Sequence, residues 1–186
     1  MKIEIDTRDM AITPEMRKHF LNYLRNHQRR VIQNANLLYR LGYITIGLRS
    51  KIAAEHDVSK TQEPEYFPYI KRKWLEKMDG VNYREMGDDV KNAIVHHVTT
   101  NTHHPEYWSN DYAGFGSDKP CHIYDMPEEC VVEMVCDWVA MGQELGNTAR
   151  QWYNSVKDRR WIFDEPTTER IEYWLSVFEK YHWGEI

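Results

Sequence analysis

The feature that most constrains the fold is a run of apolar residues at helical spacing that begins directly after a helix-start signal. Thr13 is followed by Pro14 and Glu15, the pattern of an N-cap residue with proline at the first helical position. From there apolar side chains recur at intervals near three or four residues until Gly42: Phe20, Leu21, Leu24, Val31, Leu38 and Leu41. The pattern predicts a long helix over about 14–41 with His27 in its middle.

The rest of the chain also has mainly helical patterns. Further helices are predicted over about 45–57, 66–79 and 84–104, from 126–127 onward, and over about 148–162 and 166–182. Residues 1–12 are predicted to form a short extended arm and residues 105–126 a long loop, which in a compact domain often has a function. There is no βαβ alternation and no internal repeat. We therefore predict an all-α fold, a single domain over 1–186 with about six to seven helices in a bundle. Residues 147–186 either complete that bundle or form an interface, for example in a homodimer.

Composition excludes several classes of protein. A formal net charge of −5 is unlike that of proteins that coat double-stranded nucleic acid, which need a basic face. The three cysteines form no CxxC pair, and an odd number suits a reducing compartment. No stretch has the apolar length of a membrane span, and the N-terminus lacks the apolar core of a signal peptide. We expect a cytoplasmic protein, in the host cytoplasm if the gene belongs to a phage.

Histidine is concentrated in the stretch AIVHHVTTNTHHPEYW at residues 93–108. Four of the nine histidines in the chain, His96, His97, His103 and His104, lie here within nine residues. If the helix continues as far as Pro105, a separation of seven residues is about two turns, which puts His97 and His104 on one stripe and His96 and His103 on the next. Only one stripe can point fully inward. The stretch is therefore predicted to be half of a metal site, with one of its first two histidines on the surface.

Other potential ligands occur on separate predicted helices. His27 lies in the first helix, His56 and Asp57 are adjacent at the end of the second, and Asp137 lies in the fifth. A helical bundle can bring such side chains together in its interior. Imidazole nitrogen and carboxylate oxygen together suit Mn, Fe, Co, Ni or Zn, so we expect one or two divalent transition metal ions. His19 is an alternative to His27, because register alone does not exclude it.

The order of these residues resembles that in the HD-domain superfamily of metal-dependent phosphohydrolases. The motif HDVSK at 56–60, the histidine block and EMVCDW at 133–138 together resemble more closely an uncharacterised family of phage and bacterial proteins, a domain of unknown function, over roughly residues 20–145. The superfamily resemblance implies an all-α fold. By position it implies a central metal set of His27, His56, Asp57 and Asp137, with His97, His103 and His104 as candidates for a second metal.

Two features depart from the superfamily pattern. Lys60 stands where members acting as simple nucleotidases have an acidic residue, whereas lysine at this place occurs in binuclear members such as cyclic-dinucleotide phosphodiesterases and a few di-iron oxygenases. The four clustered histidines also lie closer together than the corresponding ligands of binuclear phosphodiesterases, which leaves open which of them bind metal.

The resemblance and the residues predict three catalytic roles. Asp57, with two carboxylate oxygens, would bridge two ions, and Lys60 would hold a phosphate oxygen as a point charge. Glu133, one turn before Asp137, would orient a ligand imidazole, and Asn101 could do likewise. The simpler interpretation of Lys60 is an exposed lysine after a helix. The simpler interpretation of Glu63 and Glu65 is a pair of helix-start carboxylates favoured by the dipole.

Three functions follow as hypotheses. The first is a metal-dependent phosphohydrolase that acts on a small phosphorylated substrate, such as a nucleotide, by metal-activated water. The second is an HD-type di-iron oxygenase. The third is a non-catalytic phage accessory protein in which a metal only holds the helices together.

Overall fold

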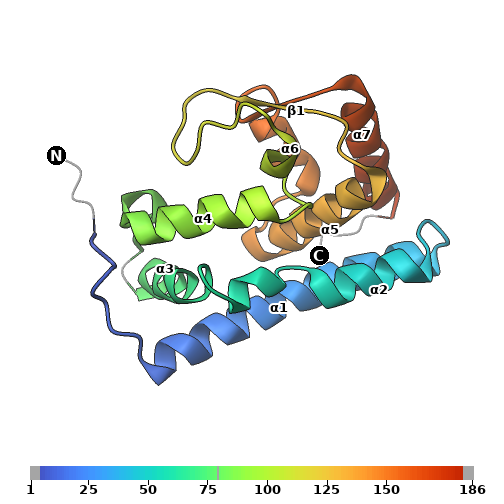
Figure 1. The fold of residues 1–186 in the computed structure, drawn as a ribbon. Helices are drawn as coiled ribbons and strands as arrows, with labels where there is room; N and C mark the ends of the chain where they lie inside the picture. Colours follow the sequence, from blue (N-terminus) through green and yellow to red (C-terminus); the bar gives the residue numbers. More distant parts are fainter. Residues whose placement is uncertain (1–4, 79, 182–186) are drawn as a thin grey trace.

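The predicted all-α fold is confirmed. The computed structural model describes residues 5–78 and 80–181, and within them the chain forms seven α-helices and two short strands (Figure 1). The helices are α1 (Pro14–Arg40), α2 (Ile46–Glu55), α3 (Tyr66–Met78), α4 (Asp88–Thr100), α5 (Glu128–Leu145), α6 (Ala149–Val156) and α7 (Glu165–Lys180). The strands are β1 (Cys121–Ile123) and β2 (Trp161–Phe163), and single 3₁₀ turns, η1 (Val58–Thr61), η2 (Tyr83–Glu85) and η3 (Pro105–Trp108), lie between the helices.

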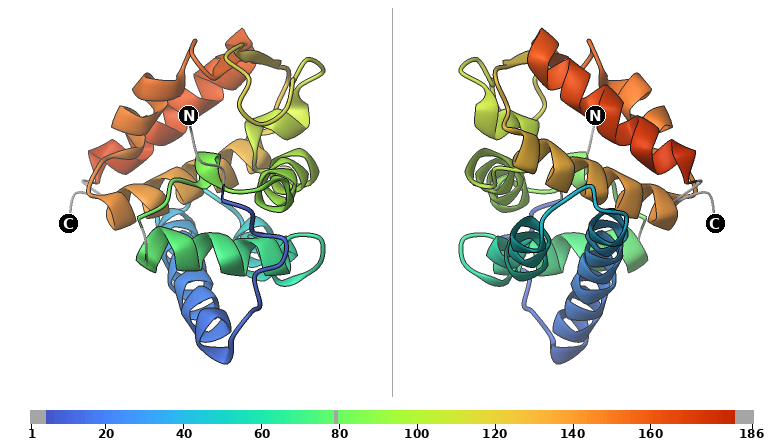
Figure 2. Two further views of the ribbon diagram at one scale, coloured as in Figure 1. Left: turned by 90° about the vertical axis from the view of Figure 1, so that its left-hand side faces the viewer. Right: turned by 90° about the vertical axis from the view of Figure 1, so that its right-hand side faces the viewer.

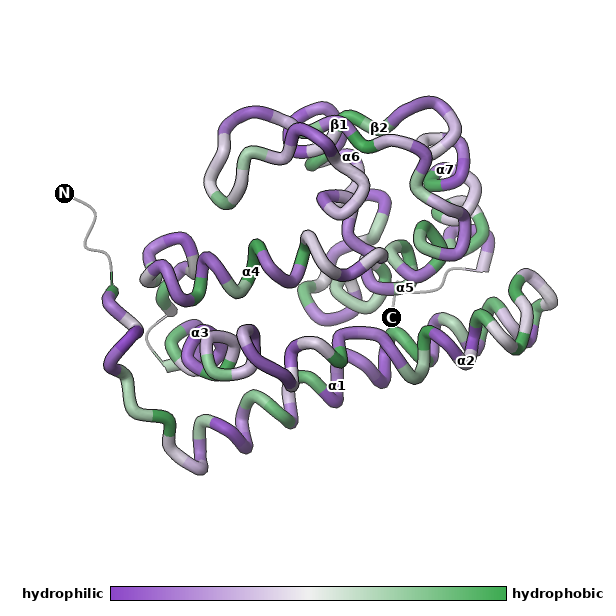
Figure 3. Tube along the Cα trace, viewed as in Figure 1, coloured by the Kyte–Doolittle hydropathy of each residue, from purple (hydrophilic) through white to green (hydrophobic). Residues whose placement is uncertain are grey.

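Helix α1 begins where the sequence predicts it. The Thr13 side chain accepts a hydrogen bond from the Met16 backbone N–H at 3.2 Å, and proline occupies the first helical position. The buried residues of α1 then follow one stripe at alternating intervals near three and four, and they include Phe20, Leu24, His27, Val31 and Leu38. The same alternation is visible along α1 in Figure 3. His27 therefore points inward because it occupies a core position of the helix.

The helices pack around α1 and α5. α1 contacts α2, α3 and α5, while α5 also contacts α6 and α7, and α3 contacts α4. In the side views of Figure 2, α6 and α7 lie on the opposite side of α5 from α1. α5 is consequently buried on nearly every side, and its Glu133 and Asp137 are held in the interior of the molecule.

Two apolar clusters make up the core, and they meet near the middle of α1. The first, which we call the N-terminal core, lies between the first half of α1, α3 and α4 and includes Phe20, Leu24 and Ile70. The second, the C-terminal core, lies between the second half of α1, α5, α6 and α7 and includes Val31 and Trp138. Because His27 falls between Leu24 and Val31, it lies where the two cores meet.

Several predicted boundaries are wrong. The helix expected over 148–162 ends at Val156, because Asp158 adopts a left-handed conformation with φ of 63° and the chain then forms β2. β2 pairs in parallel with β1, which lies inside the segment predicted to be a loop. Residues 149–180 complete the bundle, while residue 182 of the last predicted helix lies outside the described residues. In the predicted N-terminal arm, Ile5 pairs with Met86, and residues 1–4 lie outside the described residues.

The helix predicted to continue through the histidine stretch is also shorter than expected. α4 begins at Asp88, after η2, and it ends at Thr100. Asn101 is extended, and its side-chain amide donates a hydrogen bond to the carbonyl of His97 at 2.8 Å. The Thr100 hydroxyl donates likewise to the carbonyl of His96 at 2.6 Å. Because Asn101 leaves the helical conformation, the helix stops before the second histidine pair.

Among the described residues, no helix is both long and apolar enough to cross a membrane. The three cysteines, Cys121, Cys130 and Cys136, are free and buried.

Candidate metal centre

The centre is organised around Asp57, which follows α2 in an unusual backbone conformation. α2 ends at Glu55, His56 is close to extended, and Asp57 is left-handed with φ of 59°. Aspartate tolerates this region better than most residues. The carbonyl of His56 accepts a hydrogen bond from the Gln28 side chain at 2.9 Å, which fixes the turn to α1. Both neighbouring side chains, His56 and Asp57, are therefore buried in the same place.

The first set of ligands surrounds Oδ2 of Asp57 and consists of that atom with His27, His56 and Asp137. His27 Nε2 lies 3.2 Å from His56 Nε2, 3.4 Å from Asp57 Oδ2 and 3.1 Å from Asp137 Oδ1. His56 Nε2 lies 3.8 Å from Asp57 Oδ2 and 3.9 Å from Asp137 Oδ1. Four ligands at about 2.1 Å from a tetrahedral metal are about 3.4 Å apart. These five separations bracket that value, and the ligand atoms of His27, His56 and Asp57 all lie within 4.8 Å of one another.

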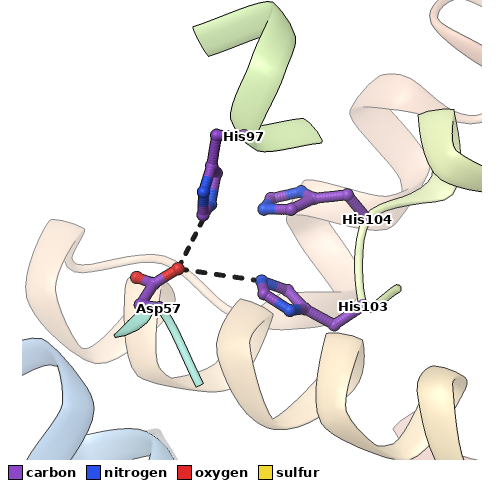
Figure 4. Close-up of side chains that lie close together, drawn as sticks. All are labelled: Asp57, His97, His103 and His104. Carbon is purple, nitrogen blue, oxygen red and sulfur yellow. Dashed lines mark ion pairs between the residues drawn. The ribbon is translucent and has the colours of Figure 1, made fainter. Parts of the chain in front are cut away.

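The second set surrounds the other oxygen of the same carboxylate. Asp57 Oδ1 lies 3.2 Å from His97 Nε2 and 3.8 Å from His103 Nε2 (Figure 4). His104 faces both of these imidazoles, with ring centroids 4.7 Å from His97 and 4.3 Å from His103. One ligand atom from each of the four residues lies within 4.8 Å of every other. The close spacing of His97, His103 and His104 in the sequence is therefore compatible with one metal site that includes all three.

The donor atoms of the second set test whether an ion fits there. Asp57 Oδ1 and the Nε2 atoms of His97, His103 and His104 are all buried, and none has a hydrogen-bond partner in the described part of the chain. Buried polar atoms are nearly always paired, so four unpaired atoms that converge require an explanation. One divalent cation would satisfy all four. The buried cluster can therefore hold a metal ion.

Glu133 supports both sets at once. Its Oε1 accepts a hydrogen bond from His56 Nδ1 at 2.9 Å and lies 3.3 Å from His103 Nδ1. Because a carboxylate only accepts, these contacts favour the hydrogen on Nδ1 and leave the Nε2 lone pair for a metal. The three atoms are close enough to hold an ion themselves. We assign Glu133 instead to the orientation of the two imidazoles, because the Nε2 atoms of both rings face the other ligands around Asp57.

Glu65 has a similar role that the sequence did not predict. It is fully buried, and its Oε2 accepts hydrogen bonds from His97 Nδ1 at 2.9 Å and from the Ser59 hydroxyl at 3.0 Å. Its Oε1 lies 2.8 Å from Nδ1 of the partly exposed His96. The interpretation of Glu65 as a mere helix-start carboxylate is therefore wrong. A carboxylate at the start of a helix is too common to mark this role, and no local signal separates Glu65 from Glu63.

Lys60 contacts the centre directly. Its Nζ donates a hydrogen bond to Asp57 Oδ2 at 2.6 Å, and the side chain is only 17% exposed. The simpler interpretation, an exposed lysine, is therefore wrong. Burial opposes ionisation of Asp57, but the charge of Lys60, together with His56 and His97, holds the pKa of this carboxyl well below its usual range. Asp57 is thus ionised, the form that binds metal.

Two imidazoles of the second set, those of His103 and His104, are held in the neutral form. Burial and the neighbouring His56 lower the pKa of His103 to about 4. Burial, His103 and His97 lower the pKa of His104 well below its usual value. Only neutral imidazole offers a lone pair to a metal, so the environment favours the ligating form at neutral pH.

All seven predicted ligands lie in this one place, and the alternatives do not. His19 packs against the edge of Trp74, with ring centroids 6.0 Å apart. His96 contacts Glu65 on the outer side of α4, and His122 forms an exposed pair with Asp111. Asn101 lies behind His97, where its side chain also donates a hydrogen bond to the Ser59 hydroxyl at 3.1 Å.

Fold and site together define a helical protein with a buried histidine and carboxylate centre that can hold metal. A family model described as "Family of unknown function (DUF5662)" matches residues 16–177, and the chain therefore belongs to that family. No curated protein and no solved structure matches the chain. The family description assigns no activity, and the resemblance to the HD-domain superfamily stays a prediction from the sequence.

Proposed function

We propose that the protein is a metal-dependent phosphohydrolase that acts on a small phosphorylated substrate such as a nucleotide. The observation that supports this proposal is the position of Asp57. One of its carboxylate oxygens faces His27 and His56, the other faces His97 and His103, and the Lys60 ammonium lies 2.6 Å from the carboxylate. A carboxylate shared between two ligand sets beside a fixed cation is suited to a binuclear site that binds a phosphoryl group.

The roles of the side chains follow from this arrangement. Divalent ions bound here would lower the pKa of water towards neutrality and offset the charge of a phosphoryl group. Lys60, already fixed against Asp57, would donate a hydrogen bond to a phosphoryl oxygen as a point charge. Glu133 would keep His56 and His103 in one tautomer and one orientation throughout.

The side chains of the centre differ in their exposure to solvent. The side chains of Asp57, His97 and His103 are between 1% and 4% exposed, while Asp137 is 16% and Lys60 17% exposed. Solvent therefore reaches the centre at Asp137 and Lys60. A phosphoryl group arriving there would meet the lysine before it met the more deeply buried imidazoles.

The test combines metal analysis with an activity screen. The purified protein is expected to contain divalent metal and to release phosphate or a mononucleotide from at least one of a panel of nucleotides and cyclic dinucleotides. His56→Ala is expected to lose metal and activity, while His122→Ala, which removes an exposed histidine, should retain both. Absence of metal from the wild-type protein, or unchanged metal content in His56→Ala, would overturn the proposal.

A second reaction is favoured by the composition of the first ligand set. Imidazole and carboxylate donors around one carboxylate that faces two ligand sets also suit iron, which supports the di-iron oxygenase as an alternative. Bound iron with oxygen consumption and no phosphate release would establish it instead. Tightly bound metal with neither reaction would leave the third hypothesis, a structural metal.

A further inference from the structure

A second group of cations lies on α3, and one of its members lies near the same aromatic ring as Lys60. Arg72 Nε lies 2.8 Å from one oxygen of Glu76, and Lys73 Nζ lies 2.9 Å from the other. The side chains of Arg72 and Lys73 are 19% and 16% exposed, so both cations are largely buried and still reachable from solvent. Neither residue has a part in the metal sets or in the contacts of Lys60 with Asp57.

The group is connected to the centre through two tyrosines. Lys60 Nζ lies 5.3 Å and Arg72 Cζ 5.6 Å from the centroid of the same Tyr69 ring. Lys73 Nζ lies 4.0 Å from the centroid of Tyr23, which is four residues, or one helical turn, before the metal ligand His27 on α1. Arg72 and Lys73 therefore lie near the two tyrosines that flank Lys60 and His27.

The electrostatic environment favours an anion at this position. Burial, followed by the like charge of Arg72, lowers the pKa of Lys73, and Lys60 adds to the effect. Burial also raises the pKa of the Tyr23 hydroxyl, which is sensitive to the charges of Lys60, Arg72 and Asp57. Cations that repel one another in a partly desolvated place are stabilised when a multivalent anion binds between them.

We propose that Arg72 and Lys73 form a second anion subsite, which binds the phosphoryl group next to the one held at Lys60 and the metal centre. The substrate class is then a compound with two linked phosphoryl groups, such as a nucleoside diphosphate or inorganic diphosphate. This inference rests on the proposed function for the position of the first phosphoryl group. The Arg72 guanidinium supplies a planar pair of donors, while Lys73 supplies a point charge.

Calorimetric titration of the Mn²⁺-loaded full chain with orthophosphate and with pyrophosphate tests the subsite. Wild-type protein is expected to bind pyrophosphate more tightly than orthophosphate. Arg72→Gln and Lys73→Gln should each weaken pyrophosphate binding about tenfold, because each removes a hydrogen bond between charged groups. Their effect on orthophosphate should be less than about twofold, since that anion is held at the metal centre. A parallel titration with a nucleoside diphosphate shows whether the ligand is inorganic or carries a nucleoside.

Two further variants act as controls. Lys77→Gln makes the same chemical change one turn further along α3, at an exposed lysine, and should leave pyrophosphate affinity unchanged. Glu76→Gln removes the carboxylate that competes for both cations, and it should strengthen pyrophosphate binding. An increase in affinity cannot result from partial unfolding, so this variant tests the subsite even if Arg72→Gln folds poorly.

The subsite and the enzymatic function can fail separately. Equal effects of Lys73→Gln and Lys77→Gln, or equal affinity of the wild-type protein for the two anions, would overturn the subsite. Phosphate release that is unchanged in Arg72→Gln and Lys73→Gln would also overturn it while leaving the hydrolase proposal intact. Pyrophosphate binding that depends on Arg72 and Lys73, in a protein that hydrolyses no phosphorylated compound, would support the subsite and refute the hydrolase.

Discussion

The two ligand sets around Asp57 are built on different kinds of backbone. In the first set, His27 and Asp137 project from the interiors of α1 and α5, two long helices that pack against each other. In the second set, His97 lies near the end of α4, while His103 and His104 lie in the turn that follows it. Helix packing positions the first set, whereas hydrogen bonds from side chains position much of the second. Sites on rigid helices are held more closely than sites on turns.

The contrast predicts that the second site depends more on its supporting residues. His97 is held by Glu65, His103 by Glu133, and the turn itself is continued by η3, which is tied to the C-terminal part of the chain. The first site needs fewer such contacts, because its helices are embedded in both cores. Substitutions that separate the two sites can therefore test this difference, while a substitution at the shared ligand cannot.

The largest expected effect comes from Asp57→Asn. The amide keeps the size of the side chain and removes the charge that both sets share, so both ions should be lost. Metal content measured by mass spectrometry should fall from about two equivalents to almost none, given the weak affinity of neutral amides for transition metals. Asp111→Asn, at an exposed carboxylate, is the control and should retain wild-type content. Loss of only one equivalent would show that Asp57 does not bridge the two sites.

The next largest effects should separate the sites. His27→Ala removes a ligand of the first set alone, and His104→Ala removes a ligand of the second set alone. Each variant is expected to lose about one metal equivalent and to keep the other. His19→Ala, at the histidine that packs against Trp74, should keep both. If His27→Ala and His104→Ala each lost both equivalents, the histidines would belong to one cooperative site and the division into two sets would be wrong.

The better-predicted set is also the one built on regular helices. His27 occurs on the same stripe as Leu24 and Val31, which accounts for its inward position, although the register of the helix alone left His19 as an alternative. His19 is one position away from Phe20 on that stripe, which is the physical reason why it packs against α3 instead. The spacing of Glu133 and Asp137 by one turn of α5 was similarly sufficient to place both on one face.

The second set could not be predicted in the same way, because its geometry depends on interactions remote in sequence or specific to the end of a helix. The sequence predicted a helix through His104, whereas the helix ends at Thr100 and Asn101 is extended. Glu65 contacts His97, which is 32 residues later in the chain. The spacing of residues within one helix cannot predict such a contact. The candidate ligands were therefore predictable from their chemistry and from the resemblance, whereas the role of Glu65 and the arrangement of the second set were not.

The carboxylates behind the ligands should have intermediate effects that differ between the sites. Glu133 contacts an imidazole from each set, while Glu65 contacts only His97 among the ligands. Glu133→Gln is expected to weaken metal binding at both sites by about 10-fold to 100-fold, and Glu65→Gln at the second site alone, the usual cost of losing such a support.

Titration with a metal-sensitive dye, which resolves a strong and a weak site, provides the measurement. Glu129→Gln is the matched control, since Glu129 lies one turn before Glu133 on the exposed face of α5. If Glu133→Gln weakened only one site, Glu133 would support one imidazole and the other contact would be incidental. Equal weakening of both sites by Glu65→Gln would contradict the separation of the two sets.

The smallest expected effect is at Arg160, which is far from the ligands but connected to the turn that carries two of them. Arg160 Nη2 donates a hydrogen bond to Oε1 of the buried Glu106 at 2.7 Å, and Glu106 lies in η3, two residues after His104. The side chain of Arg160 is partly exposed, so water can replace it at the Glu106 carboxylate, and we expect its loss to cost on the order of 1 kcal/mol, or about fivefold in an equilibrium constant. Arg160→Ala should therefore weaken the second site by up to about fivefold, because the turn that carries His103 and His104 becomes less constrained.

The first site should be unaffected by Arg160→Ala, since its residues lie on α1, α5 and the end of α2. Arg159→Ala removes the same charge at the neighbouring exposed position and provides the control in the same metal titration. If Arg160→Ala weakened both sites equally, the effect would be a general loss of stability. A selective effect would show that the second site depends on a contact more than fifty residues away along the chain, as expected for ligands held by a turn instead of a packed helix.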